Sequence, residues 1–224
     1  MGATIELTAG DGHRLAAYES RPGSARAAVV IVQEIFGVNE HIRAVVDRYA
    51  GRGFHAIAPA LFDRVERGVE LGYNQDDGLR GREIRAGIDW DSTVLDVGAA
   101  VAHVAATGPV ATIGYCWGGS VSWLAASELP IAAAVGYYGG QVTQFLDRTP
   151  LCPVLLHFGA LDAMIPLDGV AKIGESYPDV EVHVYDGADH GFNCDARASY
   201  QPDAAALALE RTLGFLARAG VDGG

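Results

Sequence analysis

The sequence predicts an α/β protein built on a mainly parallel, doubly wound sheet, with antiparallel N-terminal strands and helices on both faces. Three observations indicate this fold. Short apolar runs alternate with segments of helical periodicity along most of the chain. The run Ala27–Gln33 is apolar almost throughout, as in strands buried on both faces. The chain opens instead with two alternating segments around Gly10-Asp11-Gly12, which is typical of an antiparallel hairpin.

The strands are expected where short apolar or β-branched runs end at a glycine, a proline or a polar turn. In chain order they are Thr4–Leu7, Arg14–Glu19, Ala27–Gln33, His55–Ala58, Val110–Tyr115, Ile131–Tyr137, Val154–Phe158 and Val180–Tyr185. Helices are expected between them, where apolar residues recur at spacings of three and four. These are His41–Ala50, Thr93–Ala106, Val121–Ser127, Leu167–Ser176 and Ala204–Ala217.

One stretch, Leu61–Asp89, fits neither helix nor strand. It is rich in Gly, Asp and Arg and is long for a connection inside a compact domain. We interpret it as a lid or substrate-binding loop; a disordered surface loop is the alternative. No repeat or linker composition divides the chain, so residues 1–224 are expected to form a single domain.

Composition narrows the function. The net charge of −12 argues against nucleic acid or an anionic membrane as a partner, and no apolar run is long enough for a membrane span. The N-terminus lacks the pattern of a signal peptide. Three cysteines without a CxxC pair favour a reducing compartment. We therefore expect a cytoplasmic protein, monomeric, acting on a small molecule without a metal or another cofactor.

The segment Gly114-Tyr115-Cys116-Trp117-Gly118-Gly119 is the strongest functional motif. It joins an apolar run to a second run rich in Ala, Ser and Leu, and has the strand, sharp turn and helix order of a nucleophile elbow, with Cys in the place of Ser. A thiol at that position is able to act as a nucleophile. The alternative is a buried, inert Cys on a glycine-rich turn.

Two loops that follow later strands supply the partners that a nucleophile needs. Ligands of open α/β sheets bind at the carboxyl ends of the strands. Asp162 follows one such end, and His190 follows the next. The order nucleophile, acid, histidine is the one used by hydrolases with this elbow. Asp189 and Asp168 are weaker candidates for the acid.

Glu34 ends the apolar strand Ala27–Gln33, where an ionised carboxylate is costly unless it is paired. One interpretation places it beside the Cys116 thiol, where it holds or accepts the proton; the other makes it a structural ion pair with an arginine. The backbone amides of Ile35 and Trp117 would form the oxyanion hole.

Together these segments resemble the dienelactone hydrolase (carboxymethylenebutenolidase) family of the α/β-hydrolase fold. The resemblance extends over essentially the whole chain. It rests on QEIFGVN at 33–39, APALFDR at 58–64, GYCWGG at 114–119, AVGYYGG at 134–140, GALDAMIP at 159–166, GADHGF at 187–192 and ALALERTLGFL at 206–216.

The resemblance implies roles for single residues. Cys116 would be the nucleophile, Asp162 and His190 would complete the triad, and Glu34 would be the carboxylate that activates the thiol. Arg82 looks like the family's lid arginine that binds the substrate carboxylate.

Other pocket positions match the family only in part. Tyr137 and Phe36 match pocket positions, whereas Arg80 or Arg85 could replace Arg82. The second arginine that the family has four residues after its histidine is Cys194 here, and Arg197 is the nearest arginine. Ala86 stands near the place of the family's lid tyrosine.

The implied reaction is hydrolysis of an activated, anionic ester or lactone, most directly dienelactone to maleylacetate, through a thioacyl-enzyme. A broader carboxylesterase or thioesterase is the alternative within the family. Two other classes are weaker: a scaffold that binds a small acid without catalysis, and a metal or redox protein that uses Cys116, Cys194 and His190.

Overall fold

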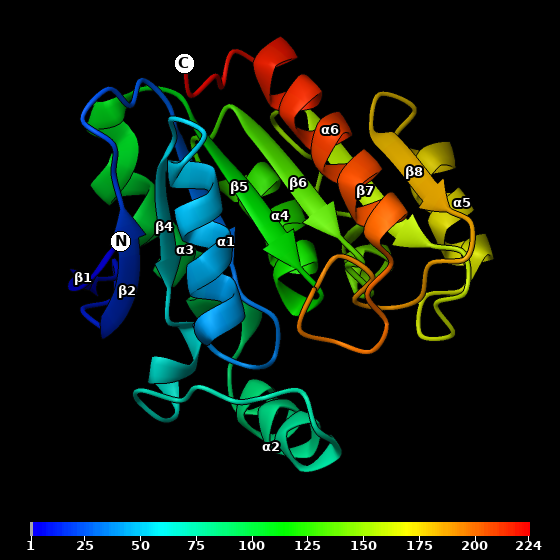
Figure 1. Ribbon diagram of the computed structural model, residues 1–224, viewed down its shortest axis with the longest axis horizontal. Coiled ribbons are helices and arrows are strands. Elements are labelled where there is room, and N and C mark those ends of the chain that lie inside the picture. Colours follow the sequence, from blue (N-terminus) through cyan, green and yellow to red (C-terminus); the bar gives the residue numbers. More distant parts are fainter. Residues whose placement is uncertain (1) are drawn as a thin grey trace.

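The computed structural model describes residues 2–224, which form an eight-stranded sheet in the order β1-β2-β4-β3-β5-β6-β7-β8 (Figure 1). The hairpin of β1 (Ala3–Thr8) and β2 (Arg14–Ser20) is antiparallel, and β2 also runs antiparallel to β4 (His55–Pro59). The other neighbouring pairs are parallel and involve β3 (Ala28–Val32), β5 (Val110–Tyr115), β6 (Ala133–Tyr137), β7 (Val154–Gly159) and β8 (Glu181–Tyr185). The predicted mixed sheet is therefore confirmed.

Helices cover both faces of the sheet (Figure 1). One face carries α1 (Glu40–Ala50) and α6 (Pro202–Arg218), and the other carries α3 (Trp90–Val104), α4 (Trp117–Glu128) and α5 (Leu167–Ser176). Because of this double cover, every residue of the strands from β3 to β7 is buried, as expected of a parallel sheet. Within residues 2–224, none of the helices is both long and apolar enough to cross a bilayer.

Two helices begin earlier than their apolar periodicity indicated. In α3 the carboxylate of Asp89 accepts a hydrogen bond of 2.7 Å from the amide of Ser92, so the helix is capped before its first apolar turn. In α4 the first turn contains Gly118 and Gly119, so the apolar periodicity of this helix begins only after them.

The stretch Leu61–Asp89 contains regular structure that the sequence did not predict. It includes a 3-10 turn, η1 (Leu61–Arg64), and a helix, α2 (Gln75–Ala86). The buried side of α2 consists of Gly78, Gly81 and Ile84. Because two of these three residues are glycines, the sequence of α2 shows no apolar repeat from which a helix could be predicted. The helix lies beyond the carboxyl ends of the parallel strands (Figure 1), the edge at which a lid was expected.

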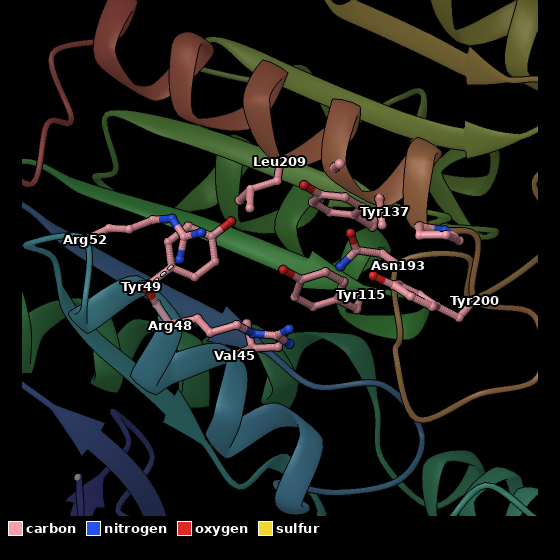
Figure 2. Close-up of a pocket in the computed structure, with 12 residues that line it drawn as sticks. Val45, Arg48, Tyr49, Arg52, Tyr115, Tyr137, Asn193, Tyr200 and Leu209 are labelled. Atoms are coloured by element: carbon pink, nitrogen blue, oxygen red, sulfur yellow. Dashed lines mark hydrogen bonds between the residues drawn. The ribbon is translucent and has the colours of Figure 1, made fainter.

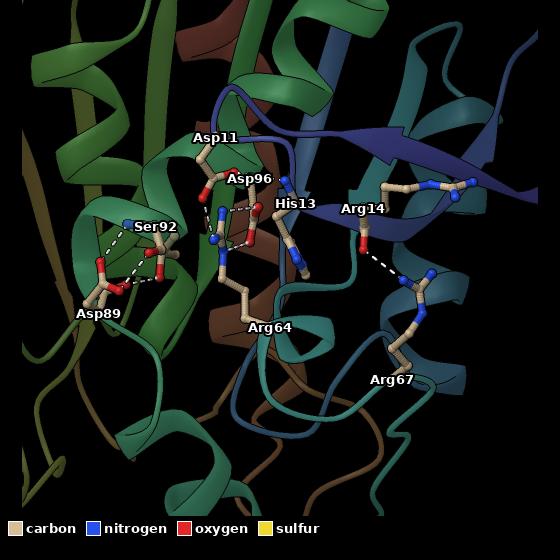
Figure 3. A network of polar contacts seen from close by, with 9 residues as sticks. Asp11, His13, Arg14, Arg64, Arg67, Asp89, Ser92 and Asp96 are labelled. Atoms are coloured by element: carbon tan, nitrogen blue, oxygen red, sulfur yellow. Dashed lines mark hydrogen bonds and ion pairs between the residues drawn. The ribbon is translucent and has the colours of Figure 1, made fainter.

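Arg64 fixes η1 to the body of the domain (Figure 3). Its guanidinium donates hydrogen bonds of 2.7 and 2.8 Å to the two carboxylate oxygens of Asp96 in α3, and one of 2.7 Å to Asp11 in the hairpin turn. Asp96 is fully buried, and its charge needs such a partner. This network holds the point from which the chain leaves the sheet toward α2.

Candidate active site

Cys116 lies on a sharp turn between β5 and α4. Its φ of 54° and ψ of −116° place a non-glycine residue in a sparsely populated conformation, so the surrounding structure must impose it. The Cys116 amide donates a 3.0 Å hydrogen bond to the carbonyl oxygen of Tyr137 on the neighbouring strand. The first turn of α4 begins at the next residue and presents free amides that can bind an anion.

The two glycines that flank the turn are required by close backbone contacts. A Cβ on Gly114 would lie 1.8 Å from the carbonyl oxygen of Gly118, and a Cβ on Gly118 would lie 2.3 Å from that of Val32. Strand and helix therefore touch backbone to backbone at the elbow. This contact is the physical cause of the Gly-x-Cys-x-Gly pattern.

Asp162 and His190 come together across the ends of β7 and β8. The Nδ1 atom of His190 lies 2.7 Å from Oδ2 of Asp162, and both residues are buried. The other Asp162 oxygen accepts a hydrogen bond from the amide of Met164 at 2.9 Å. Asp189 accepts from the amide of His190 instead, and Asp168 accepts from the amide of Gly169. Of the three acids considered, Asp162 is the one that contacts the imidazole.

His190 faces the cavity next to Cys116. Its Nε2 atom has no hydrogen-bond partner among residues 2–224. Burial alone would lower the pKa of His190, but the charge of a Cys116 thiolate and the hydrogen bond with Asp162 outweigh it and raise that pKa to about 10. The site therefore favours the charged imidazolium form of His190.

The two amides expected to form an oxyanion hole are available. In the part of the chain that the structure describes, neither Ile35 nor Trp117 donates a backbone hydrogen bond. Both residues line the cavity above Cys116. The carbonyl of Ile35 abuts α2, because a Cβ on Gly81 would lie 1.9 Å from its oxygen. Helix α2 thus packs directly on the loop that carries one of the two amides.

The cavity above Cys116 has a volume of about 650 Å³. Its walls combine apolar side chains with arginines and glutamines. The residues that line it are Ile35, Phe36, Arg82, Arg85, Ala86, Trp90, Cys116, Trp117, Gly140, Gln141, Gln144, Met164, Ile165, His190 and Arg197. Phe36 lies where it was expected, with its ring against that of Tyr73 at a centroid distance of 4.6 Å.

The arginines of α2 differ in their surroundings. Arg82 is exposed, lines the cavity and forms no salt bridge within residues 2–224. The Arg85 guanidinium is half-buried between two indole rings, 4.2 Å from the centre of Trp90 and 4.9 Å from that of Trp117. Arg80 instead pairs with Glu66 and Glu83 and does not line the cavity. Arg82 and Arg85 are therefore the two arginines of this helix that can meet a substrate.

Glu34 is paired with an arginine. Its Oε1 atom accepts a hydrogen bond of 3.0 Å from Arg197, while Oε2 is buried with no partner in the described part of the chain. The Glu34 side chain is 1% exposed and that of Arg197 21%, so the carboxylate is shielded from water while the guanidinium is partly hydrated. Arg197 also lines the Cys116 cavity and lies over the ring of Phe36. The structure thus shows the ion pair with an arginine, and that arginine borders the cavity, whereas no hydrogen bond joins Glu34 to Cys116 among the described residues.

The loop that carries His190 and Arg197 is tied to α1 through Asp195. One carboxylate oxygen of Asp195 lies 2.9 Å from Nδ1 of the buried His41, and the other accepts a 3.0 Å hydrogen bond from Arg48. These contacts hold the chain two residues before Arg197.

Tyr137 does not line the catalytic cavity, contrary to the expectation. It is fully buried, and its hydroxyl lies 2.7 Å from that of Thr212 in α6. Figure 2 shows it at a separate cavity of about 250 Å³ between α1 and α6. The next residue, Tyr138, has a φ of 41° that turns the chain, and its ring lies 5.1 Å from that of His190. The tyrosine beside the site is therefore Tyr138.

The metal or redox hypothesis finds no support at this site. Cys194 is fully buried, and burial, with the nearby Glu34 charge, raises the pKa of its thiol to about 12. Among residues 2–224, the group of ligand-type side chains close enough to share a metal ion is Glu19, His55 and His103, none of which lies here.

Sequence reasoning missed several residues of the site. From the motif AVGYYGG, Tyr137 was chosen rather than Tyr138. Met164 and Ile165 lie in GALDAMIP but were not assigned to the cavity, and Trp90, Gln141 and Gln144 lie in none of the motifs. The position of Asp89 as a helix cap could have indicated that Trp90 begins a helix at the cavity.

The fold and the site geometry define an α/β-hydrolase. The dienelactone hydrolase family profile matches residues 15–220. The carboxymethylenebutenolidase of Pseudomonas putida is 34% identical over 225 residues, covering 95% of both chains, and that of Pseudomonas sp. (strain P51) is 33% identical over 226 residues. The match with the Pseudomonas sp. enzyme covers 96% of this chain and 94% of that enzyme.

A solved structure from Klebsiella pneumoniae subsp. pneumoniae, provisionally identified as a dienelactone hydrolase, superposes with a TM-score of 0.81 at 32% identity. The match covers 96% of this chain and 99% of that one. The chain therefore belongs to the dienelactone hydrolase family, and it is a hydrolase that acts on ester or lactone bonds.

Proposed function

We propose that the protein hydrolyses an anionic, activated lactone, with dienelactone (4-carboxymethylenebut-2-en-4-olide) as substrate and maleylacetate as product. The observation that carries this proposal is the convergence of Cys116, the His190–Asp162 pair and two arginines of α2 on one cavity. Since the net charge of −12 repels an anion, local arginines are needed to attract one. Arg82 and Arg85 meet that need.

The first chemical step is attack of the Cys116 thiolate on the lactone carbonyl carbon. A carbon–sulfur bond forms, and the oxygen charge that develops is stabilised by the amides of Ile35 and Trp117. The ring carbon–oxygen bond then breaks and releases an enolate, which takes the proton of the His190 imidazolium and becomes a ketone, leaving His190 neutral. An enolate is a good leaving group, which suits a thiolate nucleophile.

Hydrolysis of the thioester completes the reaction. His190, with its ring oriented by Asp162, accepts a proton from water, and the resulting hydroxide attacks the acyl carbon. The carbon–sulfur bond breaks, and the Cys116 thiolate returns to its place beside the imidazolium. The product carries one carboxylate more than the substrate.

Glu34 would couple substrate binding to activation of the thiol. Arg197 is its partner and also lines the cavity, so a substrate carboxylate near Arg197 competes with Glu34 for the guanidinium. A Glu34 carboxylate released from Arg197 can take the proton of Cys116. This role follows the mechanism that the family resemblance implies.

The proposal is tested by comparing kcat/KM for cis-dienelactone, p-nitrophenyl acetate and an acyl thioester. Dienelactone should be the best substrate by a wide margin. Arg82→Ala should lower kcat/KM for dienelactone by about tenfold to a hundredfold, the worth of one charge-assisted hydrogen bond, and leave the neutral ester unaffected. Arg80→Ala is the matched control, because Arg80 lies on the same helix outside the cavity. An equal effect of Arg82→Ala on both substrates would refute a carboxylate-binding role.

A broader carboxylesterase or thioesterase is the second candidate. It is favoured by Cys194 and Ala86, which replace residues that the family uses for dienelactone, and by the apolar walls formed by Phe36, Trp90 and Ile165. A neutral aryl ester or a thioester turned over faster than dienelactone would support it. Absence of turnover of all three would instead favour a binding scaffold without catalysis.

A further inference from the structure

Three potential metal ligands meet at the amino ends of the parallel strands, opposite the carboxyl ends where Cys116 lies. Glu19 lies near the end of β2, His55 begins β4, and His103 lies in the last turn of α3. Glu19 pairs with Ile57 across the antiparallel ladder, so His55, two residues before Ile57, has its side chain on the same face as Glu19. Helix α3 packs over β4 and brings His103 to this face.

The two imidazoles converge on one carboxylate oxygen. Oε1 of Glu19 lies 2.5 Å from Nε2 of His55 and 2.9 Å from Nε2 of His103. All three ligand atoms lie within 4.8 Å of one another. The His55 side chain is 3% exposed, that of Glu19 20% and that of His103 39%, so the cluster is anchored in the interior and open to solvent on one side.

The orientation of His55 is fixed by a second contact. Its Nδ1 atom lies 2.7 Å from the hydroxyl oxygen of Thr107, just after α3. When Nδ1 donates to that oxygen, Nε2 presents a lone pair to the Glu19 carboxylate, and two acceptors face each other until a proton or a metal cation lies between them. A hydrogen bond to the remote ring nitrogen is also what orients histidine ligands in metal sites.

We propose that Glu19, His55 and His103 bind a divalent transition-metal ion, with Zn²⁺ as the best match. Two imidazoles and one carboxylate form an established zinc ligand set, with water in the fourth position. Tetrahedral bonds of about 2.0–2.1 Å place ligand atoms about 3.3 Å apart, so each imidazole nitrogen must move away from the Glu19 oxygen by under about 1 Å to admit the ion. His103 is exposed and Glu19 is partly exposed, so both can make that adjustment.

The metal would serve structure rather than catalysis. β4 is parallel to β3, and β3 to β5, so His55 at the start of β4 and Cys116 after β5 lie at opposite edges of the sheet. An ion at this site would join the hairpin strand β2, β4 and α3. Because only the folded chain assembles the three ligands, binding would raise the melting temperature, and the rise would grow with the logarithm of the metal concentration above the dissociation constant.

The test is titration of the protein, free of any polyhistidine tag, with Co²⁺ followed by absorption spectroscopy, and then with Zn²⁺ as competitor. We expect one equivalent of Co²⁺ to produce tetrahedral d–d bands without the sulfur-to-cobalt charge-transfer band of thiolate ligation, and Zn²⁺ to abolish them. His103→Ala and Glu19→Gln should each weaken binding by at least about tenfold. Zn²⁺ should raise the melting temperature of the wild-type protein but not of His103→Ala.

His183→Ala is the matched control, because His183 lies 4.0 Å from one glutamate, Glu181, and is not part of the cluster. It should leave binding unchanged. His103 is the most exposed of the three ligands, so its alanine variant should fold, which circular dichroism checks. Equal Co²⁺ affinity in wild type and His103→Ala, a thiolate charge-transfer band, or no binding would each overturn the proposal and leave a hydrogen-bonded triad.

Discussion

Replacing Arg197 by methionine tests how far the buried charge of Glu34 depends on its ion pair. The change keeps the apolar stem of the side chain but removes the guanidinium that pairs with Glu34. The Glu34 side chain is 1% exposed, and its second oxygen already has no partner in the described residues, so a Glu34 carboxylate without Arg197 would be buried and uncompensated.

The expected cost can be worked from this geometry. Breaking a buried ion pair by removing one partner costs about 3–5 kcal/mol. The Arg197 side chain is 21% exposed, so water can replace it in part, and we expect a loss of about 3 kcal/mol in the free energy of unfolding. The double variant Glu34→Gln/Arg197→Met removes the charge as well and should lose only about 1 kcal/mol, the worth of a hydrogen bond. The coupling energy is the cost of the double variant less the costs of both single variants, so its magnitude is at least about 2 kcal/mol and grows with the cost of Glu34→Gln alone.

Urea unfolding of the wild type, both single variants and the double variant measures this coupling. Arg85→Met is the control, because Arg85 lines the same cavity and stacks on Trp90 and Trp117 without a carboxylate partner. It should cost about 1 kcal/mol. If the double variant were as unstable as Arg197→Met, the loss of stability would not come from an unpaired Glu34 carboxylate, which would refute the role given to this ion pair.

Three further predictions follow from other contacts. Gly118→Ala should prevent folding or lower the melting temperature sharply, since its Cβ would lie 2.3 Å from the Val32 carbonyl oxygen. Gly174→Ala, whose Cβ would have nothing within 4 Å, should instead stabilise α5 by about 0.5–1 kcal/mol. Thermal unfolding of the two variants tests this contrast. Arg64→Met should lower the free energy of unfolding in urea by about 3 kcal/mol, because it leaves the buried Asp96 carboxylate without a partner. Arg67→Met, at a side chain that is 54% exposed, should lower it by about 0–1 kcal/mol. Similar losses in the two variants would contradict the role of the Arg64 network. The pKa of His190 is raised to about 10, above its ordinary value of about 6.5. Protonation of His190 therefore adds to the free energy of unfolding in full below about pH 6.5, and this contribution is lost as the pH rises through about 10. The difference in unfolding free energy between wild type and His190→Ala should therefore shrink from pH 7 to pH 10, and a constant difference would count against the imidazolium.

The sharp turn at Cys116 and the contact between Asp162 and His190 could be predicted because each carries a local pattern. Cys116 lies between glycines that the backbone contacts demand, and Asp162 and His190 each follow a strand end. In a parallel sheet those ends meet at one edge, so the order of the chain is enough to bring the three residues together.

Other features depend on contacts that no local pattern records. Helix α2 buries two glycines and one isoleucine, so its sequence shows no apolar period. Arg197 is 163 residues from Glu34, and the turn between them follows from loop contacts such as that of Asp195 with α1. Tyr137 and Tyr138 are adjacent, and the positive φ of Tyr138 decides which of the two meets His190.

The central claim of the proposed mechanism is that Cys116 carries the acyl group. The most direct measurement is peptide mass spectrometry of protein mixed with p-nitrophenyl acetate and quenched in acid during turnover. We predict one acetyl group, labile to hydroxylamine, on the peptide that contains Cys116, and no such adduct or turnover in Cys116→Ala. An acetyl group on another residue, or release of p-nitrophenol by Cys116→Ala at the wild-type rate, would contradict it.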